Sequence, residues 1–186
     1  MFRTGHYGAA LAVYAPFGAW LLSLGHPGAA VVGGAGAVWL TMLPDWDHRV
    51  SFVSHRGPTH TLAFAGLLGV GAWVAVGVAM AGLGGSASGT NLASLALGFG
   101  APAIGPLSLR AFAASVVALS VLAHLSADLL TPMGVPLLWP VTDRRYSLSV
   151  TTADSAAWNY ALFVVGVFAT GAAGYLGLEL LARGGI

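Results

Sequence analysis

Long apolar runs alternate with short polar segments along the chain. The runs extend over residues 7–24, 27–43, 61–83, 111–130 and 157–178, and polar residues, glycine and proline separate them. A helix that crosses a bilayer needs roughly 20 mainly apolar residues. The pattern therefore predicts an all-α fold, a polytopic membrane helical bundle of about five spans.

Two places along the chain need a separate interpretation. Residues 92–99 are apolar but too short to cross a bilayer, and glycines and prolines follow them, so we expect residues 84–106 to form a loop with a re-entrant or interfacial segment. Asp154 stands just before the last apolar run. Aspartate is a favoured N-cap residue, so we expect Asp154 to cap the last helix.

Composition supports a membrane protein. The chain is 57% hydrophobic and 7% charged, with a mean hydropathy of +0.82, whereas soluble domains carry about 25% charged residues. The net charge is +1 and lysine is missing from the sequence, so no nucleic-acid-binding surface is evident. The lack of cysteine excludes disulfides and thiolate metal ligands. We expect one membrane-embedded domain over residues 1–186, and the sequence does not specify an oligomeric state.

Polar residues concentrate at positions 43–60. This stretch holds two of the six acidic residues, three of the six histidines and two of the seven arginines. Neither lipid nor an apolar core accommodates such groups cheaply, so they must reach water, pair or bind something. Carboxylates and imidazoles beside arginines indicate a metal site that handles an anion.

The arginines predict how the bundle is oriented. Five spans place one group of arginines on one side of the membrane, namely Arg3, Arg49, Arg56, Arg144 and Arg145. Arg110 and Arg183 fall on the other side. Because positively charged residues favour the cytoplasmic side, we expect the first group to face the cytoplasm from the cytoplasmic (inner) membrane. The same topology brings His6, the 45–60 loop and the end of the fourth run to that face.

The fourth run carries a pair of ionisable residues near its end. His124 and Asp128 are four residues apart, so a helix places them on one face. Together they can offer a nitrogen and an oxygen to one cation, or they can form a hydrogen-bonded pair inside the membrane. An ionisable residue in a membrane span is a functional candidate by default.

The polar loop offers further ligands. Asp45, Asp47 and His48 combine oxygen and nitrogen donors, a mixture that suits zinc, manganese or iron better than calcium. His55 and His60 add two imidazoles, unless this loop merely faces lipid headgroups. His6 joins these candidates through the predicted topology. We expect one or two divalent ions, with zinc favoured.

Two arginines are candidates for contact with an anionic substrate. A guanidinium holds a phosphate or carboxylate by paired donors, which suggests this role for Arg56 and Arg144. Arg144 and Arg145 also fit a simpler role as positive anchors at the membrane surface. Asp47, if it is not a ligand, is a candidate general base.

Several motifs in combination resemble one known family. They are Leu43-Pro44-Asp45-Trp46-Asp47-His48, His55-Arg56-Gly57-Pro58-Thr59-His60, His124-Leu125-Ser126-Ala127-Asp128 and Thr131-Pro132-Met133-Gly134-Val135. The chain resembles the YdjM-like family, described as LexA-regulated, membrane-bound, metal-dependent hydrolases. The resemblance implies an all-helical membrane hydrolase, distantly similar to zinc-dependent phospholipase C. It also implies a ligand set of His6, Asp45, Asp47, His48, His55, His60, His124 and Asp128.

Two classes of function fit these observations. We expect a metal-dependent, phosphoesterase-like hydrolase that uses a metal-activated water on a lipid or another membrane-proximal anionic substrate. The alternative is a non-enzymatic membrane protein with a bound metal, either a transporter or a structural bundle. Transporters place their binding groups near the middle of the membrane, whereas most of these candidates fall at one face. A haem protein ranks third, because no two histidines lie deep in facing spans.

Overall fold

The computed structural model describes residues 1–49, 56–82 and 107–184. These residues form five long helices: α1 (Arg3–Ser23), α2 (Pro27–Leu40), α3 (Leu62–Gly82), α5 (Leu109–Leu129) and α6 (Ala156–Ala182). Two short 3-10 helices, η1 (Pro44–Arg49) and η2 (Pro58–His60), lie between α2 and α3. The predicted all-helical bundle is therefore confirmed. The expected re-entrant segment at residues 84–106 lies outside the described residues.

Most of these helices suit a bilayer. Within the described residues, four stretches are long and apolar enough to cross a membrane: Pro27–Asp47, Leu62–Met80, Leu109–Leu129 and Ala156–Ala182. The fifth helix, α1, is not among them, and it packs against α2, α5 and α6. Large apolar side chains of α6 point outward, with Phe168 78% exposed and Tyr175 67% exposed. An outer surface of this kind is the one that lipid tails cover.

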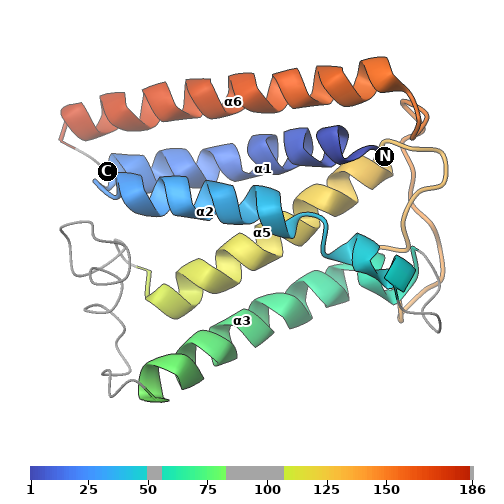
Figure 1. Ribbon diagram of the computed structural model, residues 1–186, viewed down its shortest axis with the longest axis horizontal. Helices are drawn as coiled ribbons and strands as arrows, with labels where there is room; N and C mark the ends of the chain where they lie inside the picture. Colours follow the sequence, from blue (N-terminus) through green and yellow to red (C-terminus); the bar gives the residue numbers. More distant parts are fainter. Residues whose placement is uncertain (50–55, 83–106, 185–186) are drawn as a thin grey trace.

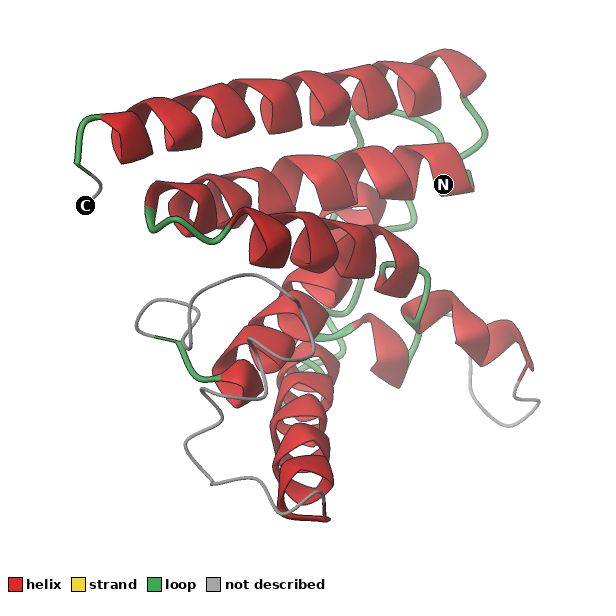
Figure 2. Ribbon diagram, turned by 60° about the vertical axis from the view of Figure 1, so that its left-hand side comes forward, coloured by secondary structure: helices red, strands yellow, loops and turns green. Residues whose placement is uncertain are grey.

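The helices lie side by side with both polar segments at one end of the bundle (Figure 1). α6 and α3 flank the bundle on opposite sides, with α1, α2 and α5 between them (Figure 1). α1 and α6 begin, and α2 and α5 end, at the end that holds η1 and η2; we call it the site end. Figure 2 shows the same helices joined by loops. An isolated antiparallel bridge joins Val135 to Tyr146 in the loop after α5.

Close packing of α1 on α6 fixes the position of the first helix. A Cβ added at Gly8 would meet the backbone of Leu162 and Phe163, and one added at Gly166 would meet the backbone of Gly8. Small residues allow this close approach between membrane helices. At the site end, the amide of Phe2 donates to Oδ1 of the buried Asn159 at 2.9 Å. These contacts hold the first turns of α1, and with them His6, at the site end.

The N-cap prediction for the last helix is wrong by one residue. Ser155 is the N-cap of α6, and its hydroxyl accepts a hydrogen bond from the amide of Trp158 at 3.5 Å. Asp154 lies one residue earlier, and a hydrogen bond from Thr152 lowers the pKa of its exposed carboxyl group. A serine hydroxyl can therefore fill the capping position while the aspartate next to it bonds to the preceding turn.

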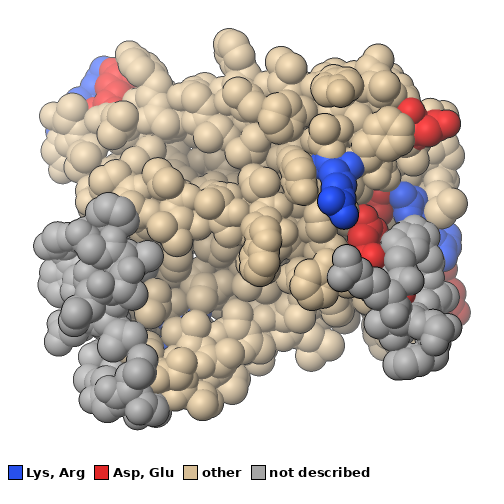
Figure 3. Space-filling model, viewed as in Figure 1, with Lys and Arg blue, Asp and Glu red and all other residues tan. Residues whose placement is uncertain are grey.

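Charged side chains gather towards the two ends of the bundle and leave an uncharged surface between them (Figure 3). α1 begins at the site end, so Arg3 lies there, as do Arg56, Arg144 and Arg145 on the loops. Arg110 and Arg183 lie at the opposite end, where α5 begins and α6 ends. The predicted division of the arginines between two ends is therefore confirmed for these six side chains. Such a division suits a bundle that spans a bilayer.

Candidate metal centre

Four side chains from three elements point their donor atoms at one place at the site end. Asp45 comes from η1, His60 from η2, and His124 and Asp128 from the last turns of α5. His60 Nε2 lies 3.2 Å from His124 Nε2, 3.5 Å from Asp45 Oδ1 and 3.5 Å from Asp128 Oδ2. His124 Nε2 lies 3.4 Å from Asp45 Oδ1 and 3.4 Å from Asp128 Oδ2. Residues that the sequence separates by more than sixty positions therefore share one cluster, which we call the donor cluster.

The separations within the donor cluster are short enough for its imidazoles to share an ion with a carboxylate. A tetrahedron with metal–ligand bonds of about 2.0–2.1 Å has edges of about 3.3–3.4 Å. The five separations given above all lie between 3.2 and 3.5 Å, close to that edge length. Asp45 and Asp128 belong to different groups of potential ligands, Asp45 with His60 and His124, and Asp128 with His6 and His124. Octahedral coordination at about 2.1 Å would instead give neighbouring ligands about 3.0 Å apart and opposite ones about 4.2 Å apart. Imidazole nitrogens together with carboxylate oxygens are a donor mixture that suits zinc.

The four members differ in their access to water. His60, His124 and Asp128 have side chains that are at most 1% exposed, whereas the Asp45 side chain is 22% exposed. A zinc site of the catalytic type has three protein ligands and one position for water, and the three buried donors can supply those ligands. Asp45 marks the open side of the cluster.

A hydroxyl next to His60 sets the orientation and the tautomer of its ring. Thr59 Oγ1 donates to Asp47 Oδ2 at 3.0 Å and lies 3.0 Å from His60 Nδ1. Since the hydroxyl proton points to Asp47, the hydroxyl oxygen accepts from Nδ1–H of His60. The lone pair of Nε2 then faces the donor cluster, as metal ligation requires. Burial lowers the pKa of His60 below its ordinary value, which also favours the neutral ring.

Asp47 lies behind His60, away from the donor cluster. Its Oδ2 is 3.6 Å from His60 Nδ1, on the side of the ring opposite Nε2. The same oxygen accepts from the amide of Arg56 at 3.2 Å. Carboxylates behind a metal-binding histidine commonly hold the ring and increase its basicity. These contacts of Asp47 support His60, and its predicted roles as a ligand or a general base stay predictions.

Arg56 supports Asp128 in a similar way. Its Nη2 donates to Asp128 Oδ1 at 2.7 Å and its Nη1 donates to Thr131 Oγ1 at 3.1 Å. The arginine is 5% exposed, and its backbone takes the left-handed conformation with φ of 54°. The two carboxylate oxygens of Asp128 are therefore divided: Oδ1 pairs with the guanidinium and Oδ2 faces the donor cluster. Both terminal nitrogens of the Arg56 guanidinium therefore donate to side chains of the protein itself.

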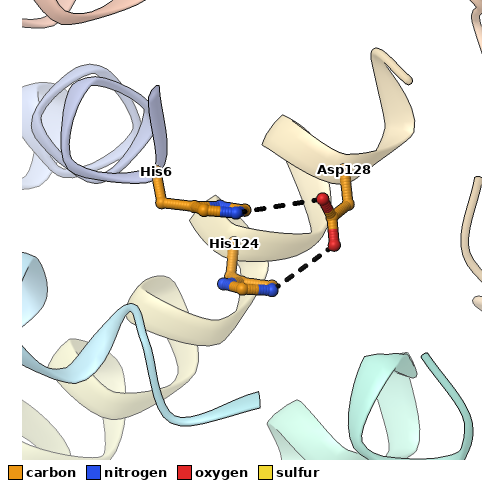
Figure 4. Close-up of side chains that lie close together, drawn as sticks. All are labelled: His6, His124 and Asp128. Carbon is orange, nitrogen blue, oxygen red and sulfur yellow. Dashed lines mark ion pairs between the residues drawn. The ribbon is translucent and has the colours of Figure 1, made fainter. Parts of the chain in front are cut away.

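His6 lies against the other face of the cluster. Its ring stacks on that of His124, with centroids 4.0 Å apart and planes 2° from parallel. Figure 4 shows the two rings side by side, each reaching a different oxygen of Asp128. His6 Nε2 is 3.9 Å from Oδ1, the oxygen that also contacts Arg56, and the amino nitrogen of Met1 is 3.5 Å from it. His6, His124 and Asp128 form a second group of potential ligands, but cationic nitrogens already surround the oxygen that a second ion would share.

A family model matches residues 1–183, and its description is YdjM inner membrane protein. The chain belongs to this family. No match to the chain was found among the curated proteins or among the solved structures. The resemblance inferred from the sequence motifs is confirmed, and the family description places the protein in the inner membrane.

The remaining predicted site residues of this YdjM family member lie in different places. His55 is outside the described residues, as is the side chain of His48. Arg144 is exposed, and its guanidinium carbon lies 5.4 Å from the centroid of the Tyr146 ring. Among the described residues, the structure brings together His6, Asp45, Asp47, Arg56, His60, His124 and Asp128.

Two supporting residues, Thr59 and Thr131, were not among the predicted site residues. Thr59 connects Asp47 to His60, and Thr131 accepts from Arg56 while donating to the Asp128 carbonyl at 2.8 Å. Threonine is common in helices and loops, so its hydroxyl indicates nothing until the fold places it next to a charged group. The one signal in the sequence was proximity, because Thr59 precedes His60 and Thr131 follows Asp128 by three residues.

Proposed function

We propose that this YdjM family member is a membrane-bound, metal-dependent hydrolase of phosphoric esters, acting on a lipid or another membrane-proximal anionic substrate. The observation that carries the proposal is the donor cluster, in which two imidazole nitrogens lie 3.2 Å apart and each lies 3.4–3.5 Å from two carboxylate oxygens. His60, His124 and Asp128 would hold one ion, zinc in preference to manganese or iron, and the fourth position, next to Asp45, would be open to water.

Each residue around the donor cluster has its own role in the proposed reaction. A bound divalent cation would supply Lewis acidity and lower the pKa of a coordinated water to about 7. Asp45 is the exposed carboxylate of the cluster, so it is best placed to accept a proton from a water in the open position. Asp47 and Thr59 orient His60, and Arg56 holds Asp128. We place the site on the cytoplasmic side, because the site end carries the larger group of arginines.

The direct test is hydrolysis by purified, zinc-loaded protein in detergent, with bis-p-nitrophenyl phosphate, phosphatidate and phosphatidylglycerol as substrates. We expect turnover with at least one phosphoric ester. Replacement of a general base typically slows the reaction by about 100-fold or more, so Asp45→Asn should do so at saturating zinc. His26→Ala is the matched control, because His26 lies between α1 and α2 at the far end of the bundle.

Two results would count against the hydrolase. One is a zinc-loaded protein that turns over none of these esters. The other is equal turnover by wild type and Asp45→Asn, since the residue at the open position would then have no chemical role.

The second candidate is a structural metal site. It is favoured by the number of protein donors, because four protein ligands close a tetrahedral zinc site. Such an ion would tie η1 and η2 to the end of α5 without chemistry. Removal of the ion would then lower the thermal midpoint of unfolding, and the loaded protein would show no turnover. A transporter is less well supported, because the donor cluster lies at one end of the bundle.

A further inference from the structure

A cavity opens next to the exposed side of the donor cluster. It has a volume of about 780 Å³ and lies between the start of α1, the loop into η1, and the start of α6. Asp45 is part of its lining, and the other three members of the donor cluster are not. A molecule in this cavity would therefore approach the cluster from the open side.

The lining of the cavity is mainly apolar, with one arginine. Phe2, Met42, Trp46 and Tyr160 contribute apolar surface, and Arg3 contributes the positive charge. Within the described residues, the exposed Arg3 guanidinium makes no hydrogen bond or ion pair with the protein, and it does not pair with Asp45 in the same lining. The Arg3 guanidinium and the Asp45 carboxylate of the donor cluster thus line one cavity and do not form an ion pair with each other.

The surroundings of the cavity are those of a membrane interface. Trp46 is 53% exposed, Tyr160 is 63% exposed and Trp39 is 76% exposed. Tryptophan and tyrosine concentrate at the level of lipid headgroups. A second hollow of about 160 Å³ shares Arg3, Met42 and Trp46 and adds Trp39 and Leu40 of α2. The cavity therefore adjoins a second hollow beside the last turn of α2, where Trp39, Leu40 and Leu43 contribute apolar side chains.

We propose that this cavity binds a membrane lipid with a phosphate headgroup, that Arg3 holds the phosphate, and that the acyl chains leave along the hollow beside α2. A guanidinium forms charge-assisted, bidentate hydrogen bonds with phosphate oxygens. The aromatic rim and the apolar continuation favour a lipid over a water-soluble phosphate. The inference rests on the proposed hydrolase, because it names the substrate class of that site. It also names Arg3 as the residue that recognises the substrate.

The test measures equilibrium binding of a non-hydrolysable dioctanoyl lipid with a phosphonate headgroup to the zinc-loaded protein, by tryptophan fluorescence. Loss of a charge-assisted pair should weaken binding of this lipid by about tenfold or more in Arg3→Gln. Arg3→Lys keeps the positive charge but lacks the planar guanidinium, so its affinity for the lipid should lie between those of wild type and Arg3→Gln. Arg183→Gln removes the same charge at the far end of the bundle, where Arg183 pairs with Glu179, and should bind as wild type does. Dioctanoylglycerol, which has no phosphate, should bind wild type and Arg3→Gln equally.

Three results would overturn this inference. They are unchanged lipid binding by Arg3→Gln, a larger loss in Arg144→Gln than in Arg3→Gln, or displacement of the lipid by millimolar inorganic phosphate. The inference and the proposed hydrolase fail separately. Arg3-dependent lipid binding by a zinc-loaded protein without turnover would leave the lipid site and remove the hydrolase. Turnover with the same KM in wild type and Arg3→Gln would support the hydrolase and remove the role of Arg3 in lipid binding.

Discussion

At the scale of single residues, the members of the donor cluster could be predicted, but how each side chain is oriented could not. The spacing of His124 and Asp128 placed both on one helix face, and the structure confirms that they lie together. Asp45 and Asp47 are two residues apart, yet one faces the cluster and the other lies behind His60. The 3-10 turn of η1 separates these two side chains, and that turn is not evident from the residue types.

Arg56 shows the same limit and leads to a prediction about stability. The sequence suggested a contact with substrate, but both ends of its fork bind Asp128 and Thr131. Removing one partner of a buried ion pair leaves the other charge unpaired, at a cost of about 3–5 kcal/mol. We therefore expect Arg56→Gln to lower the free energy of unfolding by about 3 kcal/mol in detergent, as measured by thermal or denaturant unfolding.

Arg144→Gln is the matched control for this prediction. Arg144 is exposed at the same end of the bundle, so its replacement should change stability by less than about 0.5 kcal/mol. If Arg56→Gln is as stable as wild type but loses substrate binding, Arg56 contacts the substrate, as the sequence suggested, and does not stabilise Asp128.

At the scale of helices, the apolar runs located all five elements, but their ends shifted where polar residues continue a helix. The first run was predicted to begin at residue 7, and α1 begins at Arg3, because backbone hydrogen bonds continue through polar side chains. The last run was predicted to end at residue 178, whereas α6 continues to Ala182. There, Glu179 and Arg183 form an ion pair one turn apart. Polarity marks where a helix leaves an apolar environment, not where it ends.

Glycines in the spans indicated close packing without naming the partners. A side chain at Gly166 would collide with the backbone of Gly8, whereas Gly171 on the same helix has open space around it. We expect Gly166→Leu to separate α1 from α6 and to lower the free energy of unfolding by about 1–3 kcal/mol or more. Gly171→Leu should leave stability close to that of wild type. Thermal unfolding of the two variants in the same detergent checks this, and equal midpoints would show that the helices do not touch at Gly166.

At the scale of the whole molecule, the division of the arginines predicts the orientation. The chain has no cysteine, so single cysteines can report which side each end faces. Val141, 88% exposed, lies in the loop at the site end, and Ala182 is the last residue of α6 at the other. In spheroplasts, a membrane-impermeant maleimide should label Ala182→Cys, and should label Val141→Cys only after permeabilisation. Labelling of Val141→Cys in intact spheroplasts would reverse the orientation.

The convergence of the polar segments was predictable at this scale because topology alone places them at one end. The separations of 3.2–3.5 Å within the donor cluster were not predictable, since they depend on how η1, η2 and the end of α5 meet. No pattern of apolar and polar positions contains that information. The inner-membrane family assignment agrees with the fold and leaves the chemistry of the site to be tested.

The most direct test of the account is the metal content of protein purified from zinc-supplied cells and passed over a chelating resin, measured by mass spectrometry of the ions. Wild type and His26→Ala should each hold about one zinc per chain, and His124→Ala and His60→Ala should hold almost none, because each removes one of the three proposed ligands. Zinc content in His124→Ala and His60→Ala equal to that of wild type, or no bound metal in wild type, would contradict the metal centre itself.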